Sequence, residues 1–333
     1  MSFTNSARFV VAFLCMAIMS SPFAAESHVG FREMKNENLV FGVWYPTETT
    51  PQVMSLGPFE VNYAKDAPPH GEMLPLVLLS HGVNGRYRNH HLTASDLARN
   101  GYIVIAPQHK EILPRFEDMP GRVDDFRNAV VELQNNSDFD GILDADTIHA
   151  VGYSRGGAAV LAAAGVDINF SAYKFHCAQN YDKDENACRG FTLWLRTMLR
   201  LVAAYGKKQE KEVMSFSDNS LQLQKIALVA PVGIIMDAES LAKMKSETLI
   251  MQIKDDEQLR APYHSEHLRK NLPAHKTQHM LISPGHHYAF VGPFPKQFAD
   301  KIKDIPGFTD PPNFDRRAFI TDINQKILDF LAK

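Results

Sequence analysis

Residues 149–164 read HAVGYSRGGAAVLAAA, and this stretch decides the fold that we expect. An apolar run reaches a serine that stands between glycines, and an alanine-rich segment with helical composition follows. Residues 152–156, GYSRG, fit the pattern G-x-S-x-G, which is typical of a tight strand-to-helix turn that exposes a serine at the carboxyl end of a sheet. The glycines remove side chains that would clash with neighbouring elements. The pattern predicts Ser154 as a nucleophile, with a simple turn serine as the alternative.

Apolar runs and helical segments alternate on both sides of this turn. Continuous rather than alternating hydrophobicity predicts strands buried on both faces, which is typical of a parallel sheet. We expect strands at residues 38–46, 74–80, 102–107, 147–152, 225–231, 248–254 and 278–283, and helices at residues 93–100, 123–134 and 314–331. The Pro- and Gly-rich residues 47–73 are interpreted as a loop. This order predicts a doubly wound, mostly parallel α/β sheet.

Residues 165–223 interrupt the alternation, and we interpret them as an inserted helical cap between core segments 26–164 and 224–333. They contain an apolar helical stretch, FTLWLRTMLRLVAAY, at residues 191–205. Helical spacing places five apolar side chains on one face, namely Phe191, Trp194, Leu195, Met198 and Val202. We expect this face to pack over the sheet, with an acyl pocket or transient contact with a membrane surface as alternatives.

The first 25 residues have the layout of a secretory signal peptide. Arg8 precedes an apolar stretch at residues 9–19, and small residues follow near Ala24 and Ala25. About 11 apolar residues are too few for a bilayer that needs about 20, so we expect residues 1–25 to be removed on export to the periplasm or the medium. A retained N-terminal anchor is the alternative.

Two cysteines remain after removal of this segment, Cys177 and Cys188. In an oxidising compartment, such a pair most simply forms a local disulfide that closes a polar loop. Metal binding by the pair is the alternative.

Composition excludes several classes of function. The chain of 333 residues is 45% hydrophobic and 22% charged, with a formal net charge of -3, which offers no attraction to nucleic acid. There is no phosphate-binding Walker pattern and no dinucleotide fingerprint, so we expect no cofactor. The pairs His264/His267 and His90/His91 do not supply three or four metal ligands, so we expect no catalytic metal.

An acid is expected after the serine, at the end of a later strand. The stretch TLIMQIKDDEQLRAP offers Asp255, Asp256 and Glu257. The register from the strand favours Asp256, because Asp255 lies one residue early. Asp237, after the preceding strand, is a further candidate. The alternative is that these acids form a solvated turn or cap a helix that begins near Tyr263.

A histidine base is expected on the loop after the last strand, where LISPGHHYAFVGPFP supplies His286 and His287. A histidine held by a carboxylate takes the serine proton and then delivers it to the leaving group. The spacing to Phe290 favours His287, and His286 is the second choice. A surface pair without a role is the alternative. Phe290, Phe294 and Phe298 suit either an apolar acyl group or the core.

Acyl transfer also requires donors for the oxygen that becomes negative. One is the backbone N–H after the nucleophile, here Arg155, and the other comes from the loop after an earlier strand. That loop is SHGVNG, in which we assign the second donor to Val83. His81 follows a buried strand directly, so we expect it to orient this loop rather than to act as the base.

These motifs together resemble the α/β-hydrolase superfamily, and within it the group of platelet-activating factor acetylhydrolases and bacterial proteins described as predicted dienelactone hydrolases. The likeness includes VWYP, LPLVLLSHGVNG, LARNGYIVIAPQH, the serine turn and PGHHYAF. It implies an ester hydrolase that uses Ser154, Asp256 and His287. The acetylhydrolases carry their acid after the strand that here reads ALVAPVG, without a carboxylate, which favours Asp256. Dienelactone hydrolases generally use a cysteine nucleophile, so that name implies no activity here.

The sequence thus leads to a serine carboxylesterase that acts on short-chain or lipid-like esters through an acyl-enzyme. A non-catalytic ligand-binding protein on the same scaffold is one alternative. A peptidase or amidase of the same fold is another.

Overall fold

The apolar strands form the centre of a single sheet, which has ten strands in the residues that the structure describes. This structure is a computed structural model, and it describes residues 28–110, 116–204, 212–302 and 308–333. The strands are β1 (His28–Lys35), β2 (Val40–Thr47), β3 (Gln52–Leu56), β4 (Phe59–Lys65), β5 (Leu74–Ser80), β6 (Ile103–Pro107), β7 (Leu143–Tyr153), β8 (Ile168–Asn169), β9 (Val213–Met214), β10 (Leu223–Val229), β11 (Glu247–Ile253) and β12 (Thr277–Ile282). The helices are α1 (His91–Arg99), α2 (Met119–Gln134), α3 (Arg155–Ala163), α4 (Phe170–Asn180), α5 (Leu193–Ala204), α6 (Ala238–Leu241), α7 (Ser265–Asn271), α8 (Lys296–Ile302) and α9 (Arg316–Leu331).

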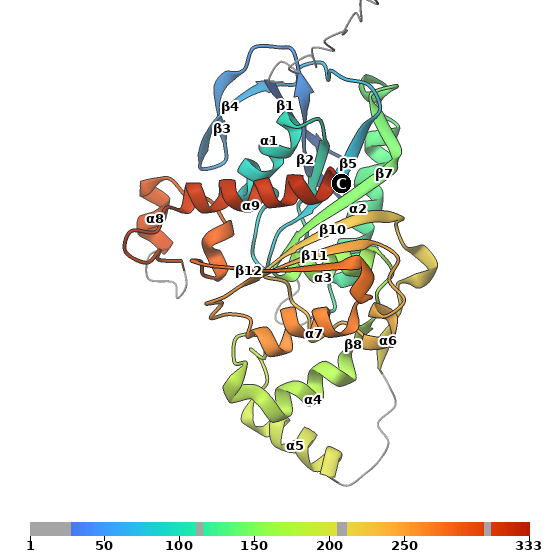
Figure 1. Cartoon of the computed structure of the whole chain (residues 1–333), viewed down its shortest axis with the longest axis vertical. Helices are drawn as coiled ribbons and strands as arrows, with labels where there is room; N and C mark the ends of the chain where they lie inside the picture. Colours follow the sequence, from blue (N-terminus) through green and yellow to red (C-terminus); the bar gives the residue numbers. More distant parts are fainter. Residues whose placement is uncertain (1–27, 111–115, 205–211, 303–307) are drawn as a thin grey trace, which may run out of the picture.

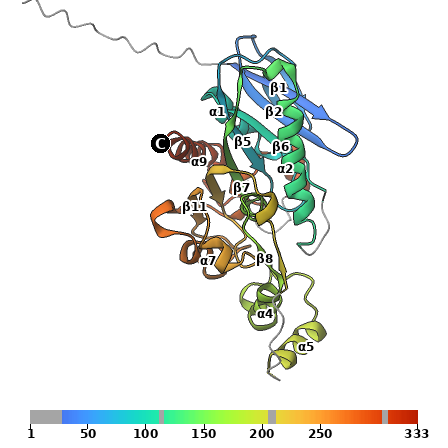
Figure 2. The same cartoon turned by 90° about the vertical axis from the view of Figure 1, so that its right-hand side faces the viewer.

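The predicted α/β architecture with a mostly parallel sheet is confirmed. The strand order is β12-β11-β10-β7-β5-β6-β2-β1-β4-β3, and every pair from β12 to β6 is parallel. Helices α2 and α3 cover one face, and α1 and α9 cover the other (Figures 1 and 2). Because both faces are covered, central side chains such as Val77, Val104 and Val151 are fully buried. The carboxyl ends of β7, β11 and β12 therefore meet at one edge of the sheet.

The interpretation of residues 47–73 as a loop is wrong. Strands β3 and β4 pair as an antiparallel hairpin, in which Gly57 turns the chain with a φ of 62°. In β4, Phe59, Val61 and Tyr63 alternate between exposed residues and are buried, which is the period-two pattern of a half-buried strand. The abundance of Pro and Gly around the hairpin obscured this pattern. Strand β1, which pairs with β2, was likewise not predicted.

Residues 165–223, which we call the insert, contribute the small β8–β9 pair and helices α4 and α5 before the chain re-enters the main sheet at β10. The expectation that the 191–205 helix packs over the sheet is wrong, because α5 packs against α4 at the end of the molecule far from the β3–β4 hairpin (Figure 1). Phe191 is buried, but Trp194 is 71% exposed and Met198 is 41% exposed.

The predicted disulfide between Cys177 and Cys188 is present and buried. It joins α4 to the loop that precedes α5, and it indicates folding in an oxidising environment. The predicted signal peptide, residues 1–25, lies outside the described residues. Within the described part of the chain, no helix combines the length and the hydrophobicity needed to cross a membrane.

Removal of the disulfide by Cys177→Ser and Cys188→Ser is expected to lower the free energy of unfolding by about 3 kcal/mol, because the reduced loop gains conformational freedom in the unfolded chain. Urea denaturation of both proteins measures the difference. Reductant serves as the control, since it should destabilise the wild type and leave the double variant unchanged. Equal midpoints for both proteins without reductant would contradict the prediction.

Candidate active site

Ser154 occupies the turn between β7 and α3 in a backbone conformation that residues other than glycine rarely adopt, with φ 55° and ψ -120°. Its N–H donates to the carbonyl of Val229 at 3.0 Å, and its own carbonyl accepts from the N–H groups of Gly157 at 2.9 Å and Val232 at 3.0 Å. Such a conformation costs on the order of 1–3 kcal/mol and persists only where the surroundings enforce it. Here the adjacent strand β10 and the residues after it hold the serine in place.

The two flanking glycines are required by close packing, as the sequence predicted. A β-carbon on Gly152 would lie 2.6 Å from the carbonyl oxygen of Gly156. A β-carbon on Gly156 would lie 2.2 Å from the carbonyl oxygen of Ser80 at the end of β5. Helix α3 therefore approaches β5 and β7 too closely for any other residue at these positions, and this approach makes the turn sharp.

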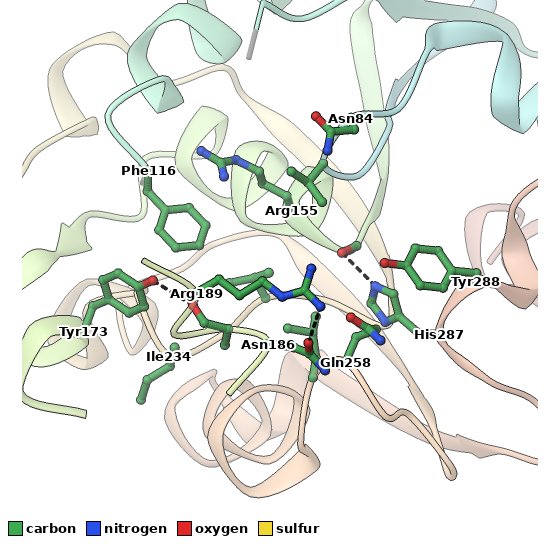
Figure 3. A pocket seen from close by; sticks show the side chains of 15 residues that line it. Asn84, Phe116, Arg155, Tyr173, Asn186, Arg189, Ile234, Gln258, His287 and Tyr288 are labelled. Carbon is green, nitrogen blue, oxygen red and sulfur yellow. Dashed lines mark hydrogen bonds between the residues drawn. The ribbon is translucent and has the colours of Figure 1, made fainter. Parts of the chain in front are cut away.

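Ser154, His287 and Asp256 form one hydrogen-bonded chain. His287 Nε2 lies 3.0 Å from Ser154 Oγ (Figure 3), and His287 Nδ1 lies 2.8 Å from Asp256 Oδ2. A carboxylate only accepts hydrogen bonds, so the ring donates from Nδ1–H to Asp256. This leaves Nε2 unprotonated and able to accept the serine hydroxyl hydrogen. The structure thus brings together the three first-choice residues, of which Ser154 and His287 are 133 positions apart and Asp256 and His287 are 31 positions apart.

The Asp256 carboxylate is fixed by the turn that contains it. Its Oδ1 accepts the backbone N–H groups of Gln258 at 2.9 Å and Leu259 at 2.8 Å, while Oδ2 faces His287. Glu257 contacts the backbone of His287, because its Oε2 accepts the His287 N–H at 3.3 Å. The remaining acidic candidates lie elsewhere. Asp255 is exposed, and Asp237 precedes α6 and accepts from the Asn169 amide at 3.4 Å. Of these carboxylates, Asp256 is the one that binds the His287 ring.

The second-choice histidine, His286, points to a different partner. Its Nε2 lies 2.7 Å from Asp310 Oδ1, and Arg316 binds the same carboxylate while donating to the carbonyl of Val291. His286 therefore helps to anchor the histidine loop to α9 and does not contact Ser154. The loop is clamped on its other side by the Tyr153 hydroxyl, which donates to the carbonyl of His287 at 2.9 Å.

Both predicted oxyanion donors belong to residues at the wall of the cavity in front of Ser154. Val83 and Arg155 line it together with Ser154 and His287 (Figure 3). Gly82 brings its loop close to the nucleophile, because a β-carbon there would lie 3.2 Å from the β-carbon of Ser154. The loop after β5 and the start of α3 therefore face the same cavity.

One buried carboxylate, which sequence reasoning missed, links these two walls. Asp118 binds the guanidinium groups of Arg122, at 3.3 Å, and Arg155. Arg122 is fully buried and also donates to the carbonyl of His81 at 3.0 Å. Because buried charges are retained only when they are paired, this network fixes the loop after β5 relative to α3. The signal in the sequence was the i, i+4 spacing of Asp118 and Arg122.

His81 lies beneath the loop, in the position expected for an orienting residue. Its Nε2 accepts the backbone N–H of His109 at 3.4 Å, and its Nδ1 lies 2.8 Å from the carbonyl of Gly82. Burial lowers the pKa of His81 well below its ordinary value, and the charge of Arg122 adds to this effect. His81 is therefore neutral and has both ring nitrogens engaged.

A second serine–histidine–aspartate chain lies below this loop. Ser80 Oγ is 3.1 Å from His109 Nε2, and His109 Nδ1 is 2.9 Å from Asp125 Oδ2. Ser80 is fully buried and does not line the cavity in front of Ser154. The same three residue types thus occur twice, and the two chains differ in their serines, because Ser154 lines the cavity and Ser80 is fully buried.

The cavity has a volume of about 210 Å³ and lies between the core and the insert. Its apolar wall comes from both, in particular from Phe116, Tyr173, Val232, Ile234 and Leu259 (Figure 3). Of the two alternatives for the phenylalanines after His287, an acyl pocket and the core, the first does not apply to this cavity, because none of the three lines it. Phe290 is buried in the core, and Phe294 stacks between Phe59 and Phe298.

Among the described residues, the nearest approach to a metal-ligand cluster is His176, Asp184 and Cys188. Cys188 is in the disulfide and has no thiolate to offer. Asp184 instead accepts hydrogen bonds from the rings of His176 at 2.8 Å and His264 at 3.1 Å, which tie the insert to the core. These hydrogen bonds lower the pKa of Asp184 to about 2 against the opposing effect of its burial.

Comparison with known proteins adds no assignment to this geometry. The chain matches no protein-family model, and the search of curated proteins returns no match.

His90 gives a test of the packing behind the site. It stacks on Tyr153 and Phe290, and burial lowers its pKa to about 4. In the unfolded chain, the pKa of a histidine is about 6.5, so the unfolded chain binds one more proton than the folded protein between pH ~6.5 and ~4. His90 therefore makes the protein less stable as the pH falls through this window. His90→Asn should reduce the slope of unfolding free energy against pH by about 1.4 kcal/mol per unit, measured by urea denaturation. An unchanged slope would contradict the burial of a neutral ring.

Proposed function

We propose that this protein is a serine carboxylic-ester hydrolase with an α/β-hydrolase fold, which acts through an acyl-enzyme. The observation that carries the proposal is the Asp256–His287–Ser154 chain, whose serine lies on a strained strand-to-helix turn and opens into a cavity. The mostly parallel sheet and the chain order serine, acid, histidine support the same fold. The proposed reaction uses no cofactor.

In the acylation step, Ser154 Oγ attacks the ester carbonyl carbon while its proton passes to His287 Nε2. The carbonyl π electrons move to the oxygen, which the backbone N–H groups of Arg155 and Val83 stabilise in the proposed site. Asp256 stabilises the His287 imidazolium that forms and accepts the hydrogen bond from its Nδ1–H. The carbon–oxygen bond of the alcohol then breaks, and His287 donates its proton to the departing oxygen.

In the deacylation step, water takes the place of the alcohol. His287 removes a proton from the water, the hydroxide adds to the acyl carbon, and the bond to Ser154 Oγ breaks as the serine regains its proton. The cavity of about 210 Å³ is smaller than a typical drug-sized ligand site, which supports short or compact acyl groups. Longer chains would have to leave the cavity along the insert.

We further propose that the protein is exported. The buried disulfide and the predicted signal at residues 1–25 support this location. The exposed face of α5, with Leu193, Trp194, Met198 and Leu201, supports transient contact with a lipid surface when the ester is lipid-like.

Ser154→Ala is expected to lower kcat/KM for p-nitrophenyl acetate and butyrate by at least about 10⁴-fold and to abolish labelling by a fluorophosphonate probe, because the nucleophile is lost. Ser80→Ala is the matched control. It removes the serine of the buried second chain, so labelling should persist. Circular dichroism checks that both variants fold.

Three outcomes would overturn the proposal. Folded wild type that takes up no probe would favour a ligand-binding protein. Faster turnover of anilides than of esters would favour an amidase. Labelling that survives Ser154→Ala would place the nucleophile elsewhere.

The two adjacent histidines provide a separate test. His287→Ala should lower kcat for ester hydrolysis by about 10⁴-fold, since no other group within reach of Ser154 takes its proton. His286→Ala should lower kcat by less than about tenfold, because its partner Asp310 remains held by Arg316. The measurement is steady-state kinetics at pH 8, and the reverse order of effects would refute the assignment of the base.

A further inference from the structure

A second arginine, besides Arg155, lines the cavity in front of Ser154. Arg189 belongs to the insert and directs its guanidinium across the cavity toward the side that holds His287 and Gln258 (Figure 3). It also lines the neighbouring cavity of about 470 Å³, which extends toward α5. Arg189 therefore lies where a substrate bound at Ser154 would pass from one cavity to the other.

The two arginines differ in their partners. Arg155 binds the buried Asp118 carboxylate and lies 4.5 Å above the ring of Phe116. Within the described part of the chain, the hydrogen-bond partner of Arg189 is a neutral amide, because its Nη2 donates to Asn186 Oδ1 at 2.7 Å. A guanidinium carries five N–H donors, so Arg189 has donors left for a ligand.

The cavity itself offers no negative charge to Arg189. None of the described residues that line it is an aspartate or a glutamate. The nearby carboxylate of Asp256 is engaged by His287 and by two backbone N–H groups, and Glu257 Oε2 accepts the backbone N–H of His287 at 3.3 Å. Arg189 therefore adds a positive charge to a lining without carboxylates, and an anionic group on the substrate would be attracted to it.

The backbone that carries Arg189 is held from several sides. The disulfide fixes the preceding residue, Cys188, and the Tyr173 hydroxyl donates to the carbonyl of Ala187 at 2.7 Å. The Asn186 amide donates to the carbonyl of Glu257 at 3.1 Å, next to the catalytic acid candidate. These contacts fix the backbone at Arg189, and the hydrogen bond to Asn186 orients its exposed guanidinium, whose planar fork matches a carboxylate.

We infer that Arg189 is a specificity-determining residue that binds a carboxylate group on the substrate, so that the preferred esters are those that carry a second, free carboxylate. This inference rests on the proposed ester hydrolase activity and specifies its substrate class. The free carboxylate belongs either to the acyl part or to the alcohol part of the ester, and matched substrates separate these two sources.

The experiment compares each anionic ester with a neutral isostere. Monomethyl glutarate is paired with methyl 5-methylhexanoate for the acyl part, and 3-acetoxybenzoate is paired with 3-isopropylphenyl acetate for the alcohol part. The readout is the ratio of kcat/KM for the anionic ester to that for the neutral ester, followed by titration of the released acid. Arg189→Met should lower this ratio by about tenfold or more in at least one pair, as expected for a lost charge-assisted hydrogen bond.

Arg260→Met is the matched control. Like Arg189, Arg260 is exposed. It follows the turn that carries Asp256, but it does not line the cavity. Its removal takes away the same charge from the same neighbourhood, so the ratio should change by less than about twofold. A similar change in both variants would indicate a general effect of net charge and would overturn the inference.

A binding measurement separates failure of the inference from failure of the proposed function. Ser154→Ala protein, which does not turn the ester over, should bind monomethyl glutarate in calorimetry, and adding Arg189→Met should weaken Kd by about tenfold or more. Unchanged ratios and unchanged Kd in a protein that still hydrolyses neutral esters would refute the role of Arg189 alone. Loss of probe labelling in the wild type would instead refute the hydrolase proposal, and the Kd comparison would still decide whether Arg189 binds the carboxylate.

Discussion

The site depends on one strained residue. Ser154 adopts a positive φ because β7 ends directly under α3. Gly152 and Gly156 have no β-carbon, so the helix lies closer to the sheet than any other residue would allow. This conformation is unfavourable in free energy. Hydrogen bonds with Val229 and Val232, which lie in the packed core, hold Ser154 in it. This packing holds the Ser154 hydroxyl 3.0 Å from His287 Nε2.

Buried charge forms the support around this turn. Asp118 joins Arg122 and Arg155 beneath the cavity, and Asp310 joins His286 and Arg316 behind the histidine loop. Each carboxylate satisfies two cationic or ring donors, which is the arrangement that makes burial of ionic groups tolerable. Both networks include helical residues, which are Arg122 of α2 and Arg155 of α3 in the first and Arg316 of α9 in the second. The loops that carry the candidate site are thus positioned by the rigid elements of the fold.

The insert completes the cavity and does not cover the sheet. It is closed by a disulfide and attached to the core through Asp184. The Asp184 carboxylate accepts hydrogen bonds from the ring of His176 in the insert and from the ring of His264 in the core. The apolar face of α5 remains exposed at the end of the molecule, whereas the loop before α5 carries Arg189 into the cavity. In the proposed esterase, residues of the core would catalyse the reaction, and Arg189 of the insert would select the substrate.

The sequence by itself determined the order of buried strands and helices, the serine turn and the disulfide, because hydrophobic continuity, local glycine spacing and cysteine pairing act over short stretches of chain. It favoured Asp256 as the candidate acid, with Asp255 and Asp237 as alternatives, and His287 as the candidate base, with His286 as the alternative. The choice between Asp255 and Asp256, and between His286 and His287, was made by tertiary structure, since adjacent side chains leave a turn in different directions and only one of each pair meets its partner. The hairpin of β3 and β4, the outward position of α5 and the roles of Asp118 and Arg189 were likewise decided there, because each depends on contacts between segments far apart in the chain.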